Sequence, residues 1–317
     1  MLLRDMYELA IERGIEADPR GKEAVLKLLS KAKKQYGDLK DDEKEEFDTE
    51  QLTNPYPDSR ISYGDLDMDV RTILVGVDID TSELLMVKEL ERSGRQIDLV
   101  ISHHPAGKSM VRFADVMQMQ SDIFESLGIP INVAEGILEE RIGEIARRLM
   151  PSNHFRVVDA ARLLGVPLMS LHTPADNQVH GFVQRHLDEK GPETLDEILK
   201  ALKEIPEYME ASRLGTGPKI LVGSKDSRPG KIVSMMTGGT GGPTKDVEEM
   251  VKAGVGTLVE MHFAEDKRKE AQKHHINVVI AGHMASDSVG MNILLDEYEK
   301  RGVEVMTCSG IIRISRN

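Results

Sequence analysis

Three short apolar runs in this chain end in histidine, and two of these endings carry an aspartate four residues later. The runs are Asp98–His104, Pro167–His172 and Asn277–His283, and Asp176 and Asp287 follow the second and the third. Short apolar runs of this kind predict buried parallel strands. In open α/β sheets, ligands and chemistry collect beyond the carboxyl ends of such strands. Imidazole and carboxylate groups at neighbouring strand ends are the ligands that a divalent metal needs.

The composition narrows the classes of function. The 317 residues are enough for two domains with their own cores. The net charge of −13 comes without a basic stripe, and aromatic residues make up only 4%, so we expect neither nucleic-acid binding nor a stacking platform for bases or sugars. The single cysteine, Cys308, excludes an internal disulfide and a cysteine-rich zinc site. No apolar run approaches the roughly 20 residues of a membrane span, and the N-terminus is too charged for a secretory signal, so we expect a cytoplasmic protein.

The order of predicted elements favours an α/β fold: two similar α/β layered domains with a mainly helical N-terminal extension. We place the extension at residues 1–70, the first α/β domain with the His-His-Pro motif at 71–190, and the second with the C-terminal Gly-His motif at 191–317. The alternative is that the last strands and helix return to the first domain. Within the extension we expect residues 1–35 to form a helical hairpin that packs on the body or on a neighbour, and we give the acidic stretch at 38–50 no metal role.

The last third of the chain repeats the order of an earlier part. Helix, glycine, strand and histidine occur in Leu90–His103 and again in Met250–His262. A predicted strand at Ile131–Ala134 echoes the strand that begins near Ile276. The spacing drifts between the echoes, so the pattern suggests duplicated halves without establishing them.

His103 and His104 leave a predicted strand together. Successive strand residues point in opposite directions, but a turn begun by Pro105 can bring both rings to one pocket or turn each towards a different ion. On its own the pair is weak support for a metal site, because an exposed loop or a hydrogen-bonded core histidine gives the same pattern.

His283 and Asp287 are stronger candidates. Gly282 ends the strand and the pattern after it is helical, so residues four apart share one helix face and can hold one ion. The alternative is that Ser286 or Asp287 simply caps the helix.

His172 and Asp176 have the same spacing, but Pro174 disfavours a regular helix between them, so we expect a shaped loop at the strand end. The alternative is an Asx-turn at Asp176. Together the motifs offer more ligands than one tetrahedral ion uses, and they suit two close ions that share a carboxylate. The candidate ligands are His103, His104, Asp176, His283 and Asp287.

The glycine-rich segment Thr237–Lys245 follows a predicted strand and precedes a helix. It does not match a phosphate-binding loop, because Lys245 does not directly follow the last glycine. Its amides could hold an anion, but we favour a tight turn that lets the backbone approach the site. His262 ends another predicted strand, where Glu260 is a candidate to line the cavity. We expect the remaining histidines at the surface, and these are His154, His180, His186, His274 and His275.

These motifs resemble the Nif-three-like family, whose members are often labelled GTP cyclohydrolase I type 2 homologues. The resemblance rests on Asp98–Pro105, His172–Asp176, Thr237–Gly239 and Ala281–Asp287, and motif order and spacing match over about residues 71–314. It implies two similar α/β domains around a dinuclear metal centre, and a toroidal homohexamer, usually a trimer of dimers.

The resemblance implies the same five metal ligands, and it makes His172 a pocket histidine that need not bind metal. There are departures from the family pattern. The family usually has Glu at the position of Asp287 and an aromatic residue at that of Met284. Because Asp is one methylene shorter, the helix must sit closer or the second ion binds weakly. We do not find the family's Trp-Asp-Asn segment, and the leading residues, about 60 of them, look like an extension or a replacement.

We therefore expect a metal-dependent hydrolase in which two divalent ions lower the pKa of a water that attacks a small substrate. The substrate would be a nucleotide or another phosphorylated or cyclic amide metabolite, and His172 would be a proton shuttle or an orienting group. Mixed imidazole and carboxylate ligands accept Zn, Fe, Mn, Co or Ni. One alternative is a metal-binding or metal-handling protein without turnover, and another is a scaffold with a structural metal site.

Overall fold

The computed structural model describes residues 1–317 and contains two β-sheets. The first sheet has the strand order β1-β4-β3-β2-β9 and the second has the order β5-β8-β7-β6. The strands of the first sheet are β1 (Arg60–Tyr63), β2 (Thr72–Gly76), β3 (Leu99–Ser102), β4 (Leu168–Ser170) and β9 (Glu304–Thr307). Those of the second sheet are β5 (Lys219–Val222), β6 (Lys231–Met235), β7 (Val255–Glu260) and β8 (Asn277–Ile280). In each sheet three strands, β2–β4 or β6–β8, run parallel, and β1 or β5 closes one edge in the antiparallel direction.

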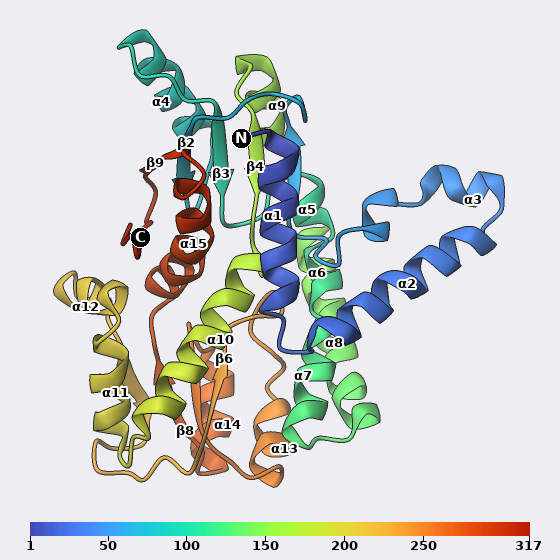
Figure 1. Ribbon diagram of the computed structural model, residues 1–317. Coiled ribbons are helices and arrows are strands. Elements are labelled where there is room, and N and C mark those ends of the chain that lie inside the picture. Colours follow the sequence, from blue (N-terminus) through green and yellow to red (C-terminus); the bar gives the residue numbers. More distant parts are fainter.

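Helices connect the strands and cover both sheets (Figure 1). They are α1 (Leu3–Glu16), α2 (Lys22–Asp38), α3 (Asp41–Glu46), the short 3-10 helix η1 (Thr49–Leu52), α4 (Thr81–Arg92), α5 (Lys108–Val111), α6 (Phe113–Val116), α7 (Met119–Leu127), α8 (Ile131–Leu149), α9 (Arg156–Leu164), α10 (Thr173–Lys190), α11 (Leu195–Lys203), α12 (Pro206–Arg213), α13 (Asp246–Lys252), α14 (Glu265–Lys273) and α15 (His283–Glu299). None of them has the length and apolar character needed to cross a bilayer. The predicted fold class, two α/β layered units with a mainly helical N-terminal part, is confirmed.

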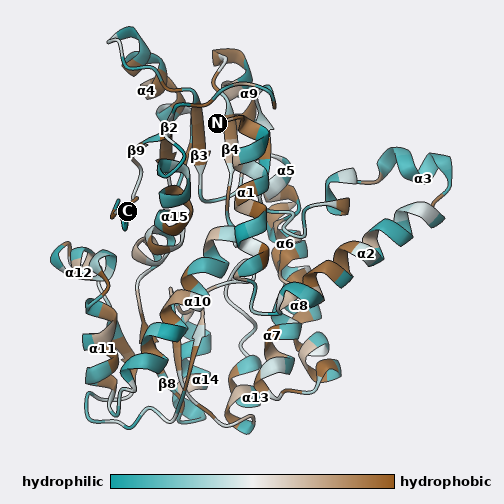
Figure 2. Cartoon of the chain, viewed as in Figure 1, coloured by the Kyte–Doolittle hydropathy of each residue, from teal (hydrophilic) through white to brown (hydrophobic).

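Alternating side chains of the strands fill the core on both faces of each sheet. In the first sheet Ile101 packs with α1 and α15, and its neighbour Val100 packs with α4 and α9. In the second sheet Val279 packs with α10 and α11, and Val278 packs with α7 and α8. Strands β2 and β3 are accordingly hydrophobic along their length (Figure 2). Such strands are buried on both faces, as expected for parallel sheets covered by helices.

Strands β1–β4 of the first sheet have the same topology as the four strands of the second sheet, but the expected echo at Ile131–Ala134 is wrong. That segment is the first turn of α8, because Ala134 begins a buried stripe of helical period that continues with Leu138 and Ile145. The counterpart of β8 is β4, since each lies between the antiparallel edge strand and the central strand of its sheet. Only α14 separates β7 from β8, whereas α5–α9 separate β3 from β4. The drift in spacing came from this false pairing. Two of the extra helices, α7 and α8, pack on the second sheet.

The N-terminal extension at residues 1–70 contains more than the helical hairpin expected at residues 1–35. Helix α1 packs against α10, and the arm formed by α2 and the hydrophilic α3 projects from the body (Figures 1 and 2). The chain then returns to the body, where Asp48 pairs with Arg60 of β1 and with Lys108 and Arg112. The extension therefore supplies an edge strand to the first sheet and fastens it to α5. At the other end of the chain, β9 pairs in parallel with β2.

Candidate metal centre

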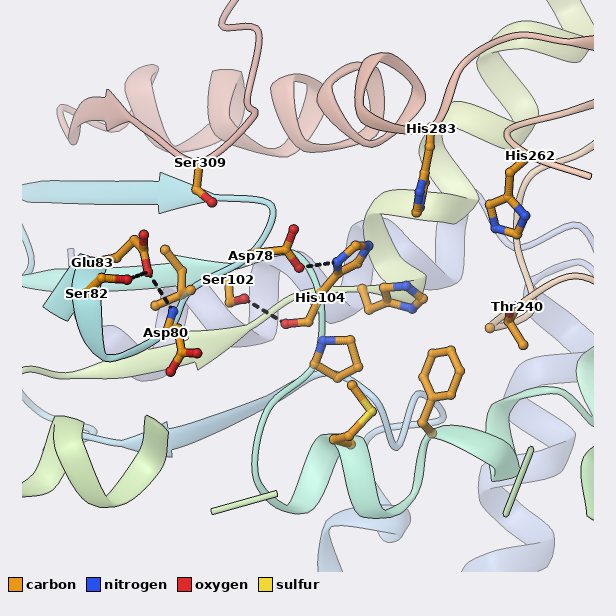
Figure 3. A pocket seen from close by; sticks show the side chains of 16 residues that line it. Asp78, Asp80, Ser82, Glu83, Ser102, His104, Thr240, His262, His283 and Ser309 are labelled. Atoms are coloured by element: carbon orange, nitrogen blue, oxygen red, sulfur yellow. Dashed lines mark hydrogen bonds and ion pairs between the residues drawn. The ribbon is translucent and has the colours of Figure 1, made fainter. Parts of the chain in front are cut away.

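The carboxyl ends of the parallel strands of both sheets face one cavity of about 470 Å³ (Figure 3). Residues that follow six different parallel strands line it, and they are Asp78, His104, His172, Thr240, His262 and His283. Chemistry is expected at such strand ends. Here two sheets contribute to the same site, which lies between them.

Three buried side chains each offer an atom that could bind a metal ion, and we call them the inner donors: His103, Asp176 and Asp287. The Nε2 atom of His103 lies 3.5 Å from Asp176 Oδ1 and 3.5 Å from Asp287 Oδ1. The Nδ1 atom of His103 donates to the carbonyl oxygen of Leu171 at 3.0 Å. This bond places a proton on Nδ1, so in the neutral ring the lone pair is on Nε2, which faces the two carboxylates.

His104 and His283, together with the shared Asp287, form the outer donors. Asp287 Oδ2 lies 3.8 Å from His104 Nε2 and 3.6 Å from His283 Nε2. Asp287 therefore turns one oxygen to each donor set. The outer imidazoles are more accessible, because the side chains of His104 and His283 are 25% and 37% exposed. His104 is oriented by Asp78, whose Oδ1 lies 2.7 Å from His104 Nδ1.

This cluster fits a divalent cation. Four of its buried atoms have no hydrogen-bond partner, namely His103 Nε2, Asp176 Oδ1 and both carboxylate oxygens of Asp287. Buried polar atoms without partners are costly and rare in folded proteins. Two ligand atoms bound to one tetrahedral zinc ion are about 3.3–3.6 Å apart, which is close to the distances between the imidazole and carboxylate atoms here. The buried His and Asp groups can thus hold metal in place of the missing hydrogen bonds.

His172 lies beside the inner donors and is held by a carboxylate that the sequence motifs did not point to. Its Nδ1 atom is 2.8 Å from Oδ2 of Asp58, which is fully buried in the loop before β1. Asp58 also accepts a hydrogen bond from Thr173, and Ser59 accepts one from the backbone N–H of His172. The ring of His172 lies 4.9 Å from that of His103. Asp58 therefore fixes His172 so that Nε2 faces the cavity.

Two helix starts place the carboxylates of the site. The expected loop between His172 and Asp176 is wrong: α10 begins at Thr173, and Pro174 lies in its first turn. Proline is tolerated there because the first N–H groups of a helix have no partner within the helix. Helix α15 begins at His283 as predicted, so Asp287 lies one turn along.

The glycine segment is a tight turn packed on α7. Gly238 and Gly239 have φ angles of 91° and 85°, and a Cβ on Gly238 would lie 2.7 Å from Cγ of Gln120. The Gln120 amide donates to the carbonyl oxygens of Gly238 and Thr240. The glycines thus let this turn form the wall of the cavity opposite His104.

The charges of the cluster depend on one another. Burial disfavours the charged form of His172, but Asp176 and Asp58 outweigh it and raise its pKa to about 9. Burial raises the pKa of Asp176 to about 6, although His172 and His103 favour its ionised form. Burial lowers the pKa of His104 to about 4, and His103 adds to this effect. A cation would compete with protons for these donors, so metal binding should release protons.

The chain was compared with known proteins and structures. No protein-family model matches it, and no curated protein matches it. The structure of a NIF3 superfamily protein from Sphaerobacter thermophilus is similar, with a TM-score of 0.69, 27% identity, and coverage of 80% of this chain and 91% of that chain. Weaker similarities include reduced HcgD from Methanocaldococcus jannaschii, with a TM-score of 0.49, 14% identity, and coverage of 78% and 88%. Another is a Bacillus cereus protein related to NIF3, with a TM-score of 0.41, 12% identity, and coverage of 79% and 90%. The chain thus has the fold of NIF3 superfamily proteins, and this confirms the resemblance that its motifs indicate.

Proposed function

We propose that this protein is a metal-dependent hydrolase that holds two divalent ions between its two sheets. The observation that carries the proposal is the position of Asp287, whose two buried and unpaired oxygens face different sets of histidine and aspartate donors. His103 and Asp176 would complete the inner set, and His104 and His283 the outer set. Two ions at such a site would supply a water of lowered pKa and polarise an oxygen of the substrate. Zn, Fe, Mn, Co and Ni all suit these ligands.

His172, positioned by Asp58, would accept and donate a proton beside the ions. The carboxylate of Asp58 accepts from Nδ1 of His172, so it orients the ring and stabilises the imidazolium. Because Nδ1 is occupied, only Nε2 is free to exchange a proton with a substrate in the cavity. We assign His172 as the residue that shuttles the proton or orients the substrate, and Asp58 as its positioning residue.

The cavity limits the substrate to a small molecule. Its volume of about 470 Å³ suits a mononucleotide or a smaller metabolite. No lysine or arginine lines it, while Asp78, Asp80 and Glu83 lie at one side. Any phosphate group of the substrate would therefore rest on the ions, and its uncharged or N–H-bearing part would face the acidic side.

A screen of the metal-loaded protein against nucleotides, phosphodiesters and cyclic amides tests the proposal. We expect turnover by the wild type, none by His103→Ala, and unchanged turnover by His275→Asn, an exposed histidine outside the site. Asp58→Asn should lower kcat about 100-fold or more while metal content stays constant, because general acid–base catalysis contributes about 10²–10⁴-fold. Equal turnover by the wild type and His103→Ala would discard the hydrolase.

A second candidate function is metal handling without turnover. The exposure of His104 and His283 favours it, since an outer ion would be open to a partner's ligands. Rapid transfer of the ion to a chelator, with no turnover of any substrate, would support this function instead. The homohexamer that the family resemblance implies remains a prediction, which light scattering on the purified protein tests.

A further inference from the structure

His262 is a histidine of the cavity that the two donor sets leave unused. It follows β7 in the same way as His104 follows β3. In the first sheet the carbonyl oxygen of Ser102 accepts a hydrogen bond from the N–H of Leu171, and His104 comes two residues after Ser102. In the second sheet the carbonyl oxygen of Glu260 accepts one from the N–H of Ala281, and His262 comes two residues after Glu260. The matching hydrogen bonds make His262 the counterpart of His104 in the second sheet. The shared topology thus brings a second strand-end imidazole to the same cavity.

The ring of His262 lies beside the outer donors. Its centroid is 4.9 Å from that of His283, with the rings nearly perpendicular, and the ring of His104 is 5.3 Å from His283 on the other side. Figure 3 shows His283 and His262 next to one another at the edge of the cavity, above Thr240.

No hydrogen bond or ion pair holds the imidazole of His262. His103, His104 and His172 differ, since Leu171, Asp78 and Asp58 each engage one of their ring nitrogens. An exposed histidine without partners is ordinarily a surface residue. Here, however, it lines the same pocket as Asp287, whose buried carboxylate oxygens have no hydrogen-bond partner. It also lies beside His283, which belongs to a set of only three candidate ligands, so an ion there has room for a further ligand.

We propose that His262 is a further metal ligand, which binds the outer ion together with His104, His283 and Asp287. The inference rests on the proposed two-ion centre and adds a residue to it. With His262 the outer ion has three imidazoles and one carboxylate, whereas the inner ion has more carboxylate character. Imidazole-rich sites suit Zn, Co, Ni or Cu, so the two positions should differ in metal preference.

The test is a titration of the metal-free protein with Zn²⁺ alone, with ¹⁵N-labelled histidine. We expect two equivalents to bind, and the imidazole ¹⁵N signal of His262 to shift with the weaker equivalent. In His262→Asn that equivalent should bind at least about 10-fold more weakly, because even the loss of a residue that only supports a ligand costs about 10–100-fold. His275→Asn is the matched control, since it removes another exposed histidine and should leave both equivalents unchanged.

The possible outcomes separate this inference from the proposed function. In one outcome two equivalents of Zn²⁺ bind, the ¹⁵N signal of His262 stays that of a free ring, and His262→Asn binds both equivalents normally. His262 is then not a ligand, and the two-ion centre stands. If the wild type binds fewer than two equivalents, both proposals are overturned. If His262→Asn does not fold, the assigned signals of the wild type decide alone.

Discussion

The inner and outer donors share Asp287 but differ in their surroundings. His103, Asp176 and Asp287 are almost fully buried, and their unpaired atoms are not accessible to solvent. The outer side chains of His104 and His283 are 25% and 37% exposed. Identical residue types thus occur in two settings within one cavity. The difference suggests that an inner ion stabilises the fold and that an outer ion is open to substrate, partner or exchange.

Replacement of the shared ligand is the most severe test of this comparison. Asp287→Asn should weaken both metal equivalents by at least about 100-fold, since the loss of a direct ligand exceeds the effect of losing its supporting residue. Asp176→Asn should weaken the inner ion only. Isothermal titration with Zn²⁺ measures both variants. Two intact binding events in Asp287→Asn would show that this carboxylate does not join the two sets.

Removal of the ions should lower stability, and mainly through the inner donors. A ligand present at 1,000 times its Kd stabilises the folded state by about 4 kcal/mol, so chelation should lower Tm on the order of 10 °C. When metal is added back, the first and more tightly bound equivalent should restore most of the lost Tm. Differential scanning fluorimetry measures Tm after each addition. If each equivalent of metal raises Tm by the same amount, the distinction between an inner structural ion and an outer exchangeable ion is wrong.

The donors could be identified from the sequence because the pattern that carries them is local. An apolar run ending in histidine marks a strand end, and strand ends of parallel sheets converge. The structure accordingly brings His103, His104, Asp176, His283 and Asp287 together. The division into inner and outer sets was not predictable, because exposure depends on how the two sheets close over each residue.

Contacts between distant parts of the chain explain what the sequence did not predict. Asp58 binds His172 from 114 residues away, and no spacing relates the two. The strand expected at Ile131–Ala134 is wrong because a mostly apolar segment of four residues does not distinguish a strand from the first turn of an amphipathic helix. Pro174 was interpreted as a helix breaker, although in a first turn it is not one.

The packing of α10 on α15 sets the distance between Asp176 and Asp287, and Gly290 permits it. A Cβ on Gly290 would lie 2.2 Å from the carbonyl oxygen of Ala175. Gly290→Ala should therefore push the helices apart, cost about 2–3 kcal/mol of stability, and weaken the inner ion more than the outer one. Urea unfolding and metal titration measure the two effects.

The matched control is Gly136→Ala in α8, where the new Cβ meets nothing within 4 Å. This variant should be more stable than the wild type by about 0.5–1 kcal/mol, because alanine favours a helix interior. If Gly290→Ala behaves like Gly136→Ala and binds both ions normally, the close approach of α10 and α15 does not position the inner donors.

Acid stability offers the smallest and most selective test, through a histidine that lies outside both donor sets. His180 was expected at the surface but is half-buried on α10, where the backbone N–H of Met236 approaches its Nδ1 atom. Burial lowers its pKa to about 4. Between about pH 6.5 and pH 4 the unfolded chain therefore binds more protons than the folded one, and stability falls as the pH falls.

Unfolding by urea in the presence of chelator, at pH 7 and pH 4.5, isolates this effect. Relative to His180→Gln, the wild type should lose about 1–2 kcal/mol between the two pH values, after allowance for the partial exposure of the ring. Parallel losses in the two proteins would mean that His180 is already free to ionise in the folded state. Once the contribution of His180 is subtracted, the remaining acid dependence belongs largely to the buried carboxylates and imidazoles. Restoring the inner ion should make that remaining dependence steeper, because protons compete with the ion for these ligands.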